Sequence, residues 1–517
     1  RMDRRLDFLT GGSRDAPERH RALRQTIAFS HDLLSPDEQV YFRRLAVFMG
    51  GATLDAVEQV CRGTAPEDGG PVPLDALEDG GPLPLEALDA VANLVDHSLL
   101  RRSEGPGGQS RFEMLETIRD YGLECLAAEG EEVRVGRAHA KFFQDLAQEA
   151  SDHLTGPDQS RWMDHLEVEH DNLRAALAWG EEHDGIVALS TATALWRFWV
   201  SRGHMREGRE WLVRLLRLPV EADEIRGRAL NAAGTLSHEM GEMEAALAFL
   251  TESLSISRRL GDRRGEGLVL NNLGWMAALS ADLEAARVHS QEALELYASL
   301  GEPRGQAVAY NNMAWAASIE GDWESAEALW DRSLTLREKA QDPRGSAFIR
   351  SYRGTARAML GRFDEAREDL DDAVSRQEEL NSRQGIANGL RALGVLHYQL
   401  DDFALAEEYA REAAAAFFET GTRGGAAISL QLQGRALVDL GRFEEARDVL
   451  SQSHALFEEM GAPWGTADVR FEEGRAAALD GRTDEARRLV QEALDVWTEM
   501  GAERKIDGCR ELLEELG

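Results

Sequence analysis

Apolar positions in the second half of the chain follow a helical spacing that recurs from segment to segment. In one segment, Phe363, Ala366, Leu370, Ala373 and Val374 fall at i, i+3, i+7, i+10 and i+11, which places them on one face of an α-helix. The bulky first position of this series is filled elsewhere by Met243, Leu283, Trp323, Phe403 and Phe443. The pattern predicts a succession of amphipathic helices, each of which buries one apolar stripe.

Small residues and turn formers divide this region into units of 40 residues. A glycine recurs at that spacing, with Ala314 in the one remaining slot, at Gly234, Gly274, Gly354, Gly394, Gly434 and Gly474. Twelve residues after each slot comes an alanine: Ala246, Ala286, Ala326, Ala366, Ala406, Ala446 and Ala486. Further breakers such as Gly361 and Asn381 indicate turns, although Ala281 and Asp401 depart from the glycine pattern. Each unit is therefore predicted to be an αα-hairpin, and the hairpins must stack into an α-solenoid.

The first 130 residues carry a different pattern. Ser35, Pro36 and Glu38 match the N-cap, first-turn proline and N3 acid of a capping box. The expected elements are helices over His20–Leu34, from Ser35, from Thr53 and over Leu85–Asp96, strands over Ser98–Arg102 and Ser110–Met114, and a helix from Leu115. Helices followed by a β-hairpin predict a winged helix with a small β-wing. The Pro- and Gly-rich segment 67–77 is interpreted as a mobile loop.

Composition narrows the class of protein. The 58 Lys and Arg residues stand against 93 Asp and Glu, which gives a formal net charge of -35. Such a chain repels polyphosphate, so we expect no direct binding of nucleic acid. Three widely separated cysteines and the lack of a long apolar run predict a cytoplasmic protein without a membrane partner. No motif of a nucleophilic or metal-dependent enzyme occurs, so we expect neither a catalytic residue nor an enzyme activity.

The repeats resemble tetratricopeptide repeats, which share this order of small, glycine, aromatic and alanine positions. The unit of 40 residues is longer than the usual one of about 34. The long form resembles the sensor arrays of bacterial signalling ATPases.

Three segments upstream sharpen the resemblance: Arg44–Phe48, Met114–Tyr121 and Glu169–Leu177. They look like the winged-helix and linker motifs of STAND ATPases, in particular of bacterial transcriptional regulators that place an NB-ARC ATPase before a tetratricopeptide array. The expected fold class is all-α, with a winged-helix domain at 1–130, a helical linker at 131–186 and a superhelical array at 187–517. We expect about eight repeats, of which the first is degenerate, and a C-terminal capping helix.

The resemblance also implies a function. The array would be a sensor arm that binds an inducer, peptide or protein in its groove and controls nucleotide exchange and oligomerisation of an NTPase. The phosphate-binding loop G-x-x-x-x-G-K-[S/T] does not occur, so ATP or ADP is expected in an upstream domain and no cofactor in this chain. Partners would be that NTPase domain, the inducer and, after activation, further copies of the chain. The alternative is a scaffold that collects protein partners without switching.

Candidate groove residues come from the same resemblance, which places two positions of each first helix on the concave face. They are Asn231, Asn271, Trp275, Asn311, Trp315, Arg391, Gln431, Arg435 and Arg475. Trp275 and Trp315 would clasp an extended peptide or an apolar ligand. In the alternative interpretation, both indoles pack between helices while Asn272 and Asn312 bond only to backbone.

The predicted winged helix departs from a nucleotide-contacting motif of the family that it resembles. Relatives carry a Met-His-Asp motif whose His reaches the bound ADP, and Met114-Leu115-Glu116 stands in its place here. Leu115 cannot donate a hydrogen bond, so Glu116 or Arg119 would have to serve in the switch. The alternative is that Leu115 packs beneath the wing.

Two polar clusters have more than one interpretation. His165, Glu169 and His170 have helical spacing, but no further ligand is spaced nearby, so we expect no metal site. Arg350, Arg353 and Arg357 occupy normally apolar positions. Either the apolar stripe has rotated to Phe348, Ile349, Tyr352 and Met359, which we favour, or the guanidinium groups pair with carboxylates between repeats.

Overall fold

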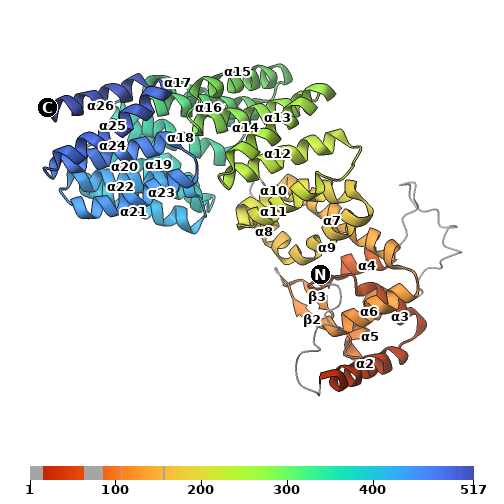
Figure 1. The fold of residues 1–517 in the computed structure, drawn as a ribbon. Coiled ribbons are helices and arrows are strands. Elements are labelled where there is room, and N and C mark those ends of the chain that lie inside the picture. The colour runs from red at the N-terminus through yellow and green to blue at the C-terminus, as the bar shows by residue number, and fades with distance from the viewer. Residues whose placement is uncertain (1–15, 63–85, 106–107, 155–157) are drawn as a thin grey trace. The chain divides into compact units, whose positions relative to one another are not determined.

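The computed structural model describes residues 16–62, 86–105, 108–154 and 158–517 (Figure 1). Clustering of contacts divides the chain into two compact units. One comprises the described residues up to 202 with 210–225, and the other comprises 203–209 with 226–517. The segment 67–77, interpreted from the sequence as a loop, lies outside the described residues.

The first unit begins with helices around a small antiparallel sheet. The helices are α2 (Ala16–Asp32), α3 (Pro36–Leu45), α4 (Leu54–Arg62), α5 (Ala87–Asp96) and α6 (Glu116–Ala128), and the strands are β1 (Ala52–Thr53), β2 (Arg101–Glu104) and β3 (Ser110–Glu113). The strand order is β1-β3-β2. The hairpin of β2 and β3 lies near its predicted place, although β2 starts three residues later. Strand β1 was not predicted, because its two residues are too few to show an alternating pattern.

The start of α3 shows how the local sequence sets an element. The Ser35 amide donates to Glu38 Oε2 at 2.6 Å, and the Glu38 amide donates to Ser35 Oγ at 3.4 Å. The predicted capping box is therefore confirmed.

Further helices follow: α7 (Glu132–His153), α8 (Gln159–Val168), α9 (His170–His183), α10 (Gly185–Arg202) and α11 (Met205–Leu215). On α7, His139 is buried between aromatic rings, with its ring centroid 5.3 Å from that of Phe48 and 4.6 Å from that of Phe143. Burial lowers the pKa of His139 to about 4, and the nearby Arg119 guanidinium acts in the same direction. The folded unit therefore keeps this imidazole neutral.

The second unit consists of antiparallel helical hairpins. Their helices are α12 (Asp223–Glu239), α13 (Met243–Leu260), α14 (Arg263–Leu279), α15 (Leu283–Leu300), α16 (Pro303–Glu320), α17 (Trp323–Lys339), α18 (Pro343–Met359), α19 (Phe363–Glu379), α20 (Arg383–Gln399), α21 (Phe403–Glu419), α22 (Arg423–Asp439), α23 (Phe443–Glu459), α24 (Pro463–Leu479), α25 (Thr483–Met500) and α26 (Glu503–Glu515). Consecutive helices pair as predicted, and α26 follows the last hairpin (Figure 1). Among the described helices, none has the length and apolar character needed to span a membrane.

Glycine in the first helix of a hairpin lets the second helix approach closely. A Cβ placed on Gly434 would lie 2.5 Å from Leu450 Cγ, and one on Gly354 would lie 2.7 Å from Leu370 Cδ2. Both leucines are fully buried. The small residue at Ser453 adds a hydrogen bond, because its hydroxyl donates to the Ala427 carbonyl at 2.8 Å. The glycines are therefore required by packing rather than by backbone conformation.

The turns inside the hairpins do need an unusual backbone conformation. Gly361 and Gly441 have φ of 76° and 71°. Ala281 and Asp401, which break the glycine pattern, adopt the same left-handed conformation with φ of 70° and 60°. The turn geometry is thus kept even where a side chain makes it less favourable.

The arginine stripe of α18 is ion-paired, and Ile349 and Tyr352 of the rotated apolar stripe also pack in an apolar cluster, so the two interpretations of the sequence hold together. Arg353 binds Asp369 of its own hairpin at 2.7 Å and Asp331 of the preceding hairpin at 2.5 Å. Arg357 contacts Asp369 and Glu327, each at 3.0 Å. Arg350 follows the same scheme with Asp372 and Glu338. The guanidinium groups remain between the repeats because each one meets carboxylates there.

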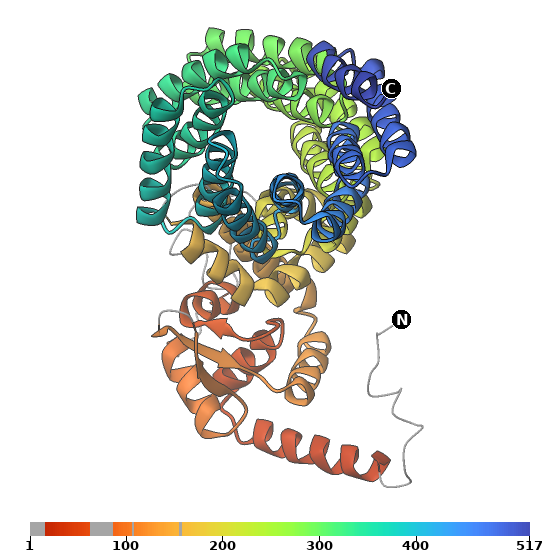
Figure 2. The ribbon, with the colours of Figure 1, turned by 90° about the vertical axis from the view of Figure 1, so that its left-hand side faces the viewer.

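The array winds until its C-terminal helix reaches an early repeat. Arg504 of α26 donates to the Gly321 carbonyl at 2.7 Å and pairs with Glu324 at 3.1 Å. In the same region, one apolar cluster contains Leu279 and Ile319 together with Trp464. Figure 2 shows the blue C-terminal helices beside the green early repeats of this unit. Helices that lie far apart in the sequence are therefore neighbours in this unit.

The close approach of the hairpin helices predicts opposite effects for two glycine substitutions. Gly434→Ala should lower the free energy of unfolding by about 1–2 kcal/mol, because the new methyl group overlaps Leu450. Gly508→Ala on α26, where a Cβ would meet no atom within 4 Å, should raise that free energy by up to about 1 kcal/mol through helix propensity. Chemical denaturation followed by circular dichroism measures both. Equal effects of the two substitutions would contradict the packing argument.

Burial of His139 predicts a pH dependence of the first unit. The pKa of a histidine in an unfolded chain is about 6.5, so its contribution to stability is present above that value and is lost as the pH falls towards about 4. The first unit should lose about 1 kcal/mol of unfolding free energy between about pH 7 and pH 5.5. Hydrogen–deuterium exchange of α7 peptides measures this loss. It should shrink in His139→Phe and persist in His97→Gln, which changes an exposed imidazole; equal pH dependence in both variants would exclude His139 as the cause.

Candidate functional site

A pocket lies in the second unit, where residues from several hairpins line one cavity. The cavity has a volume of about 170 Å³ and is partly open to solvent. It is lined from α16, α18, α20, α22, α24 and α26 by, among others, Trp315, Tyr352, Arg391, Arg435, Trp464 and Lys505. A bound molecule would therefore contact many repeats at once.

One wall of the pocket is aromatic. Trp315 contacts the edge of Tyr352, with 5.4 Å between ring centroids, and lies 6.4 Å from Trp330. Trp330 Nε1 donates to Asn311 Oδ1 at 3.2 Å, which fixes that indole. Burial raises the pKa of Tyr352, so its hydroxyl stays protonated. These rings form a rigid apolar surface suited to a flat or apolar group.

The two tryptophans singled out in the sequence lie side by side. The ring centroids of Trp275 and Trp315 are 5.9 Å apart, in an edge-to-face arrangement. Trp315 lines the pocket, whereas Trp275 packs behind it against the apolar cluster of the array. Only one of the two indoles is therefore placed to meet a ligand in this pocket. Their role in binding stays a prediction.

The early asparagines serve contacts between repeats. Asn231 and Asn271 are 5% and 4% exposed. Asn231 Oδ1 accepts from Asn272 Nδ2 at 2.8 Å, and Asn271 Nδ2 donates to the Gly305 carbonyl at 3.3 Å. Asn312 donates to the Asn271 carbonyl at 2.8 Å. Asn312 thus bonds to backbone, while Asn272 bonds to a side chain.

The later groove candidates do reach the pocket, which is lined by Arg391, Gln431 and Arg435. Arg435 lies over the Tyr398 ring at 4.2 Å from its centroid. Arg475 is not among the lining residues and binds Glu472 at 2.6 Å and Asp439 at 2.8 Å. The pocket is consequently displaced towards the C-terminal repeats relative to the predicted groove.

Lys505 of α26 completes the pocket and was missed in the sequence. Its ammonium group binds Asp468 at 2.7 Å, and both residues line the cavity. Nothing in the repeat pattern marks Lys505, because α26 lies beyond the last hairpin and enters the pocket only through the winding of the array.

The switch candidates of the first unit lie at the start of α6. Leu115 is 46% exposed and precedes the first helical residue, Glu116, so the idea that it packs beneath the wing is wrong. Arg119 Nε donates to the Phe48 carbonyl at 3.1 Å, and burial lowers the pKa of its guanidinium.

A buried polar network in the first unit was also missed. Arg111 on β3 forms an ion pair with Glu169, both almost fully buried, and Arg111 Nη2 donates to the Gly51 carbonyl at 3.0 Å. Asn172 Nδ2 donates to Glu169 at 2.8 Å, and Asn172 Oδ1 accepts from the Met49 amide at 2.7 Å. Glu169 therefore ties the sheet to the α8–α9 turn and is not available as a metal ligand.

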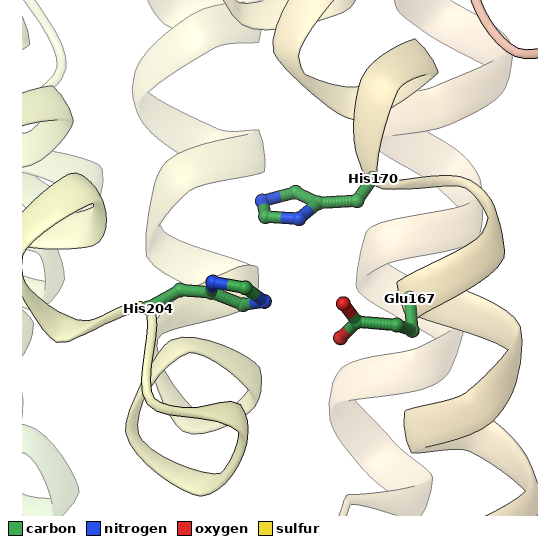
Figure 3. Close-up of side chains that lie close together, drawn as sticks. All are labelled: Glu167, His170 and His204. Carbon is green, nitrogen blue, oxygen red and sulfur yellow. The ribbon is translucent and has the colours of Figure 1, made fainter.

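Two other residues of that turn project to the same side, as Figure 3 shows for Glu167 and His170. His170 also packs edge-on against Phe198, at 5.2 Å between ring centroids. His204, drawn in the same view, belongs to the other compact unit. The turn itself thus offers two ligands, one carboxylate and one imidazole, which is fewer than the three or four protein ligands of a zinc site. The expectation of no metal stays a prediction.

Family models for the tetratricopeptide repeat match the second unit. One covers residues 226–299, 345–417 and 425–499, and another covers 306–340. The matched segments correspond to the hairpins between α12 and α25.

Curated relatives with similar sequences come from mycobacteria. The chain is 34% identical over 272 residues to the protein named "Putative HTH-type transcriptional regulator Mb0914c" of Mycobacterium bovis and to its counterpart named Rv0890c of Mycobacterium tuberculosis. The alignment covers 50% of this chain and 29% of each relative. The chain thus spans less than a third of the length of these relatives.

Among solved structures, a similar fold is that of a Signal Transduction ATPase with Numerous Domains (STAND) protein with a tetratricopeptide repeat sensor, PH0952 from Pyrococcus horikoshii. The TM-score is 0.52 at 14% identity, with 94% of this chain and 66% of that chain covered. At this identity the likeness concerns the fold alone. Residues 226–499 of this chain form a tetratricopeptide repeat array.

Proposed function

We propose that the chain is the sensor arm of a STAND signal-transduction ATPase and that its array binds an inducer, peptide or protein partner in the pocket. The pocket carries this proposal, because residues from α16 to α26 line one cavity. A ligand there would contact repeats that lie far apart in the sequence. The fold likeness to a STAND protein with a tetratricopeptide repeat sensor supports the role as a sensor arm. The name of the mycobacterial relatives supports a role in transcription regulation.

In this proposal, residues 1–130 are a winged-helix domain and residues 131–186 are a linker to the array at 187–517. The three-stranded sheet and its helices support the assignment. Leu115 cannot donate to a nucleotide phosphate, so Glu116 and Arg119 are the candidates for a switch contact. ATP or ADP would be bound by the NTPase domain upstream.

A ligand would act by favouring one winding of the array. The binding energy of the ligand is shared among several hairpins. The ligand shifts the equilibrium between two windings of the array only as far as it binds one winding more tightly than the other. That preference would set nucleotide exchange and oligomerisation of the NTPase.

Truncating the aromatic wall tests ligand binding. Trp315→Ala should weaken binding by about 2 kcal/mol, or roughly 30-fold in dissociation constant, because it removes the indole that faces the cavity. Native mass spectrometry of purified protein should detect a ligand with the unaltered chain and lose it with Trp315→Ala. Phe418→Ala, which truncates an exposed ring, should retain it. The same ligand occupancy in all three proteins would contradict the pocket.

The reading frame upstream of Arg1 tests the switch. A regulator of this kind requires a G-x-x-x-x-G-K-[S/T] loop there, and the joined protein should release ADP faster when ligand is bound. Release of labelled ADP measures this, and Trp315→Ala should abolish the acceleration. An upstream frame without the loop would refute the switch and favour a scaffold.

A further inference from the structure

The pocket contains a buried guanidinium that has no carboxylate partner among the residues that the structure describes. Arg391 on α20 is 6% exposed and lines the cavity. Arg391 Nη2 donates a hydrogen bond to a neutral acceptor, Asn388 Oδ1, at 2.9 Å. Within the described residues, no carboxylate oxygen lies within ion-pairing distance of Arg391, whereas Arg353 and Arg357 each contact more than one. A buried charge without a counter-charge is costly, so this residue needs an explanation.

The other charges around the pocket are matched. Lys505 pairs with Asp468. Arg435 lies 3.4 Å from Glu472, which also binds Arg475, and Arg475 binds Asp439 in turn. These sets hold equal numbers of cations and carboxylates. Arg391 therefore leaves the pocket with one excess positive charge, in a chain whose formal net charge is -35.

Apolar surface lies beside this charge. Tyr352 and Arg391 line the same cavity, and Trp315 packs on Tyr352. A planar guanidinium suits the two oxygens of a carboxylate. A phosphate dianion would overcompensate a single excess charge.

We propose that the pocket binds a ligand with one carboxylate on an apolar body, the carboxylate held by Arg391 and the body packed on Trp315 and Tyr352. The inference rests on the proposed function in one respect, that this pocket is the ligand site of the array. It adds the chemical class of the ligand. A free apolar acid and the C-terminal carboxylate of an apolar peptide both have this chemistry.

Matched probes test the assignment on the whole chain by isothermal titration calorimetry. Phenylacetate should bind about tenfold or more tightly than phenylacetamide, its neutral analogue, because only the acid compensates Arg391. Phenyl phosphate should bind less tightly than phenylacetate. An acetylated Leu-Ala-Phe peptide with a free C-terminus, compared with the same peptide amidated, distinguishes the peptide source from the free acid.

Arg391→Met is the decisive variant. It replaces the unpaired charge by an apolar side chain of similar length, so the thermal midpoint without ligand should stay equal or rise, while the preference for phenylacetate over phenylacetamide disappears. Arg391→Lys should retain part of the preference, since it keeps the charge without the planar fork. Arg383→Met alters an exposed arginine on the same helix and should retain all of it.

Several results would overturn the assignment. These are equal affinity of the chain for phenylacetate and phenylacetamide, an acid preference that survives in Arg391→Met, a lowered thermal midpoint of Arg391→Met, and lack of binding of every probe. If both probes bind equally and both are lost in Trp315→Ala, the carboxylate assignment fails while the pocket remains the ligand site. Failure of the sensor function would appear separately, in the release of ADP.

Discussion

Close contact between the two helices of each hairpin is the constraint on which the array depends. Gly434 and Gly354 face fully buried leucines at distances that leave no room for a β-carbon. The same close contact recurs in other hairpins, as between Gly234 and Leu250. The stacked hairpins wind until Arg504 of α26 meets the backbone of Gly321. Each hairpin of this winding is held together by the close packing of its two helices.

The pocket follows from this winding, and its chemistry differs from that of the walls around it. The partly buried arginines of α18 meet carboxylates of the adjacent helices, as Arg353 meets Asp369. The same rule of compensation holds for Arg475 and Lys505. Arg391 departs from it inside a cavity with an aromatic wall. Burying the Arg391 guanidinium without a counter-charge costs free energy, and the proposed ligand carboxylate would supply that counter-charge.

The first unit shows how a polar residue can look functional in the sequence and be structural in the fold. Glu169 stands between two histidines at helical spacing, which resembles a ligand set. In the structure its carboxylate is occupied by Arg111 and Asn172, and Asn172 also accepts from the Met49 amide. A buried charge that is both paired and hydrogen-bonded holds elements together. The sheet and the α8–α9 turn are joined in this way.

The sequence by itself determined the helices, the hairpins and their turns, because these depend on spacings of a few residues that recur every 40. It also marked Trp315, Arg391, Gln431 and Arg435, which line the pocket. Only the tertiary structure decided that Asn231 and Asn271 bond between repeats, that the α18 arginines are paired, and that Lys505 closes the cavity. These outcomes depend on contacts between helices of different hairpins. How such helices lie relative to one another depends on the winding of the whole array, which no local sequence pattern encodes.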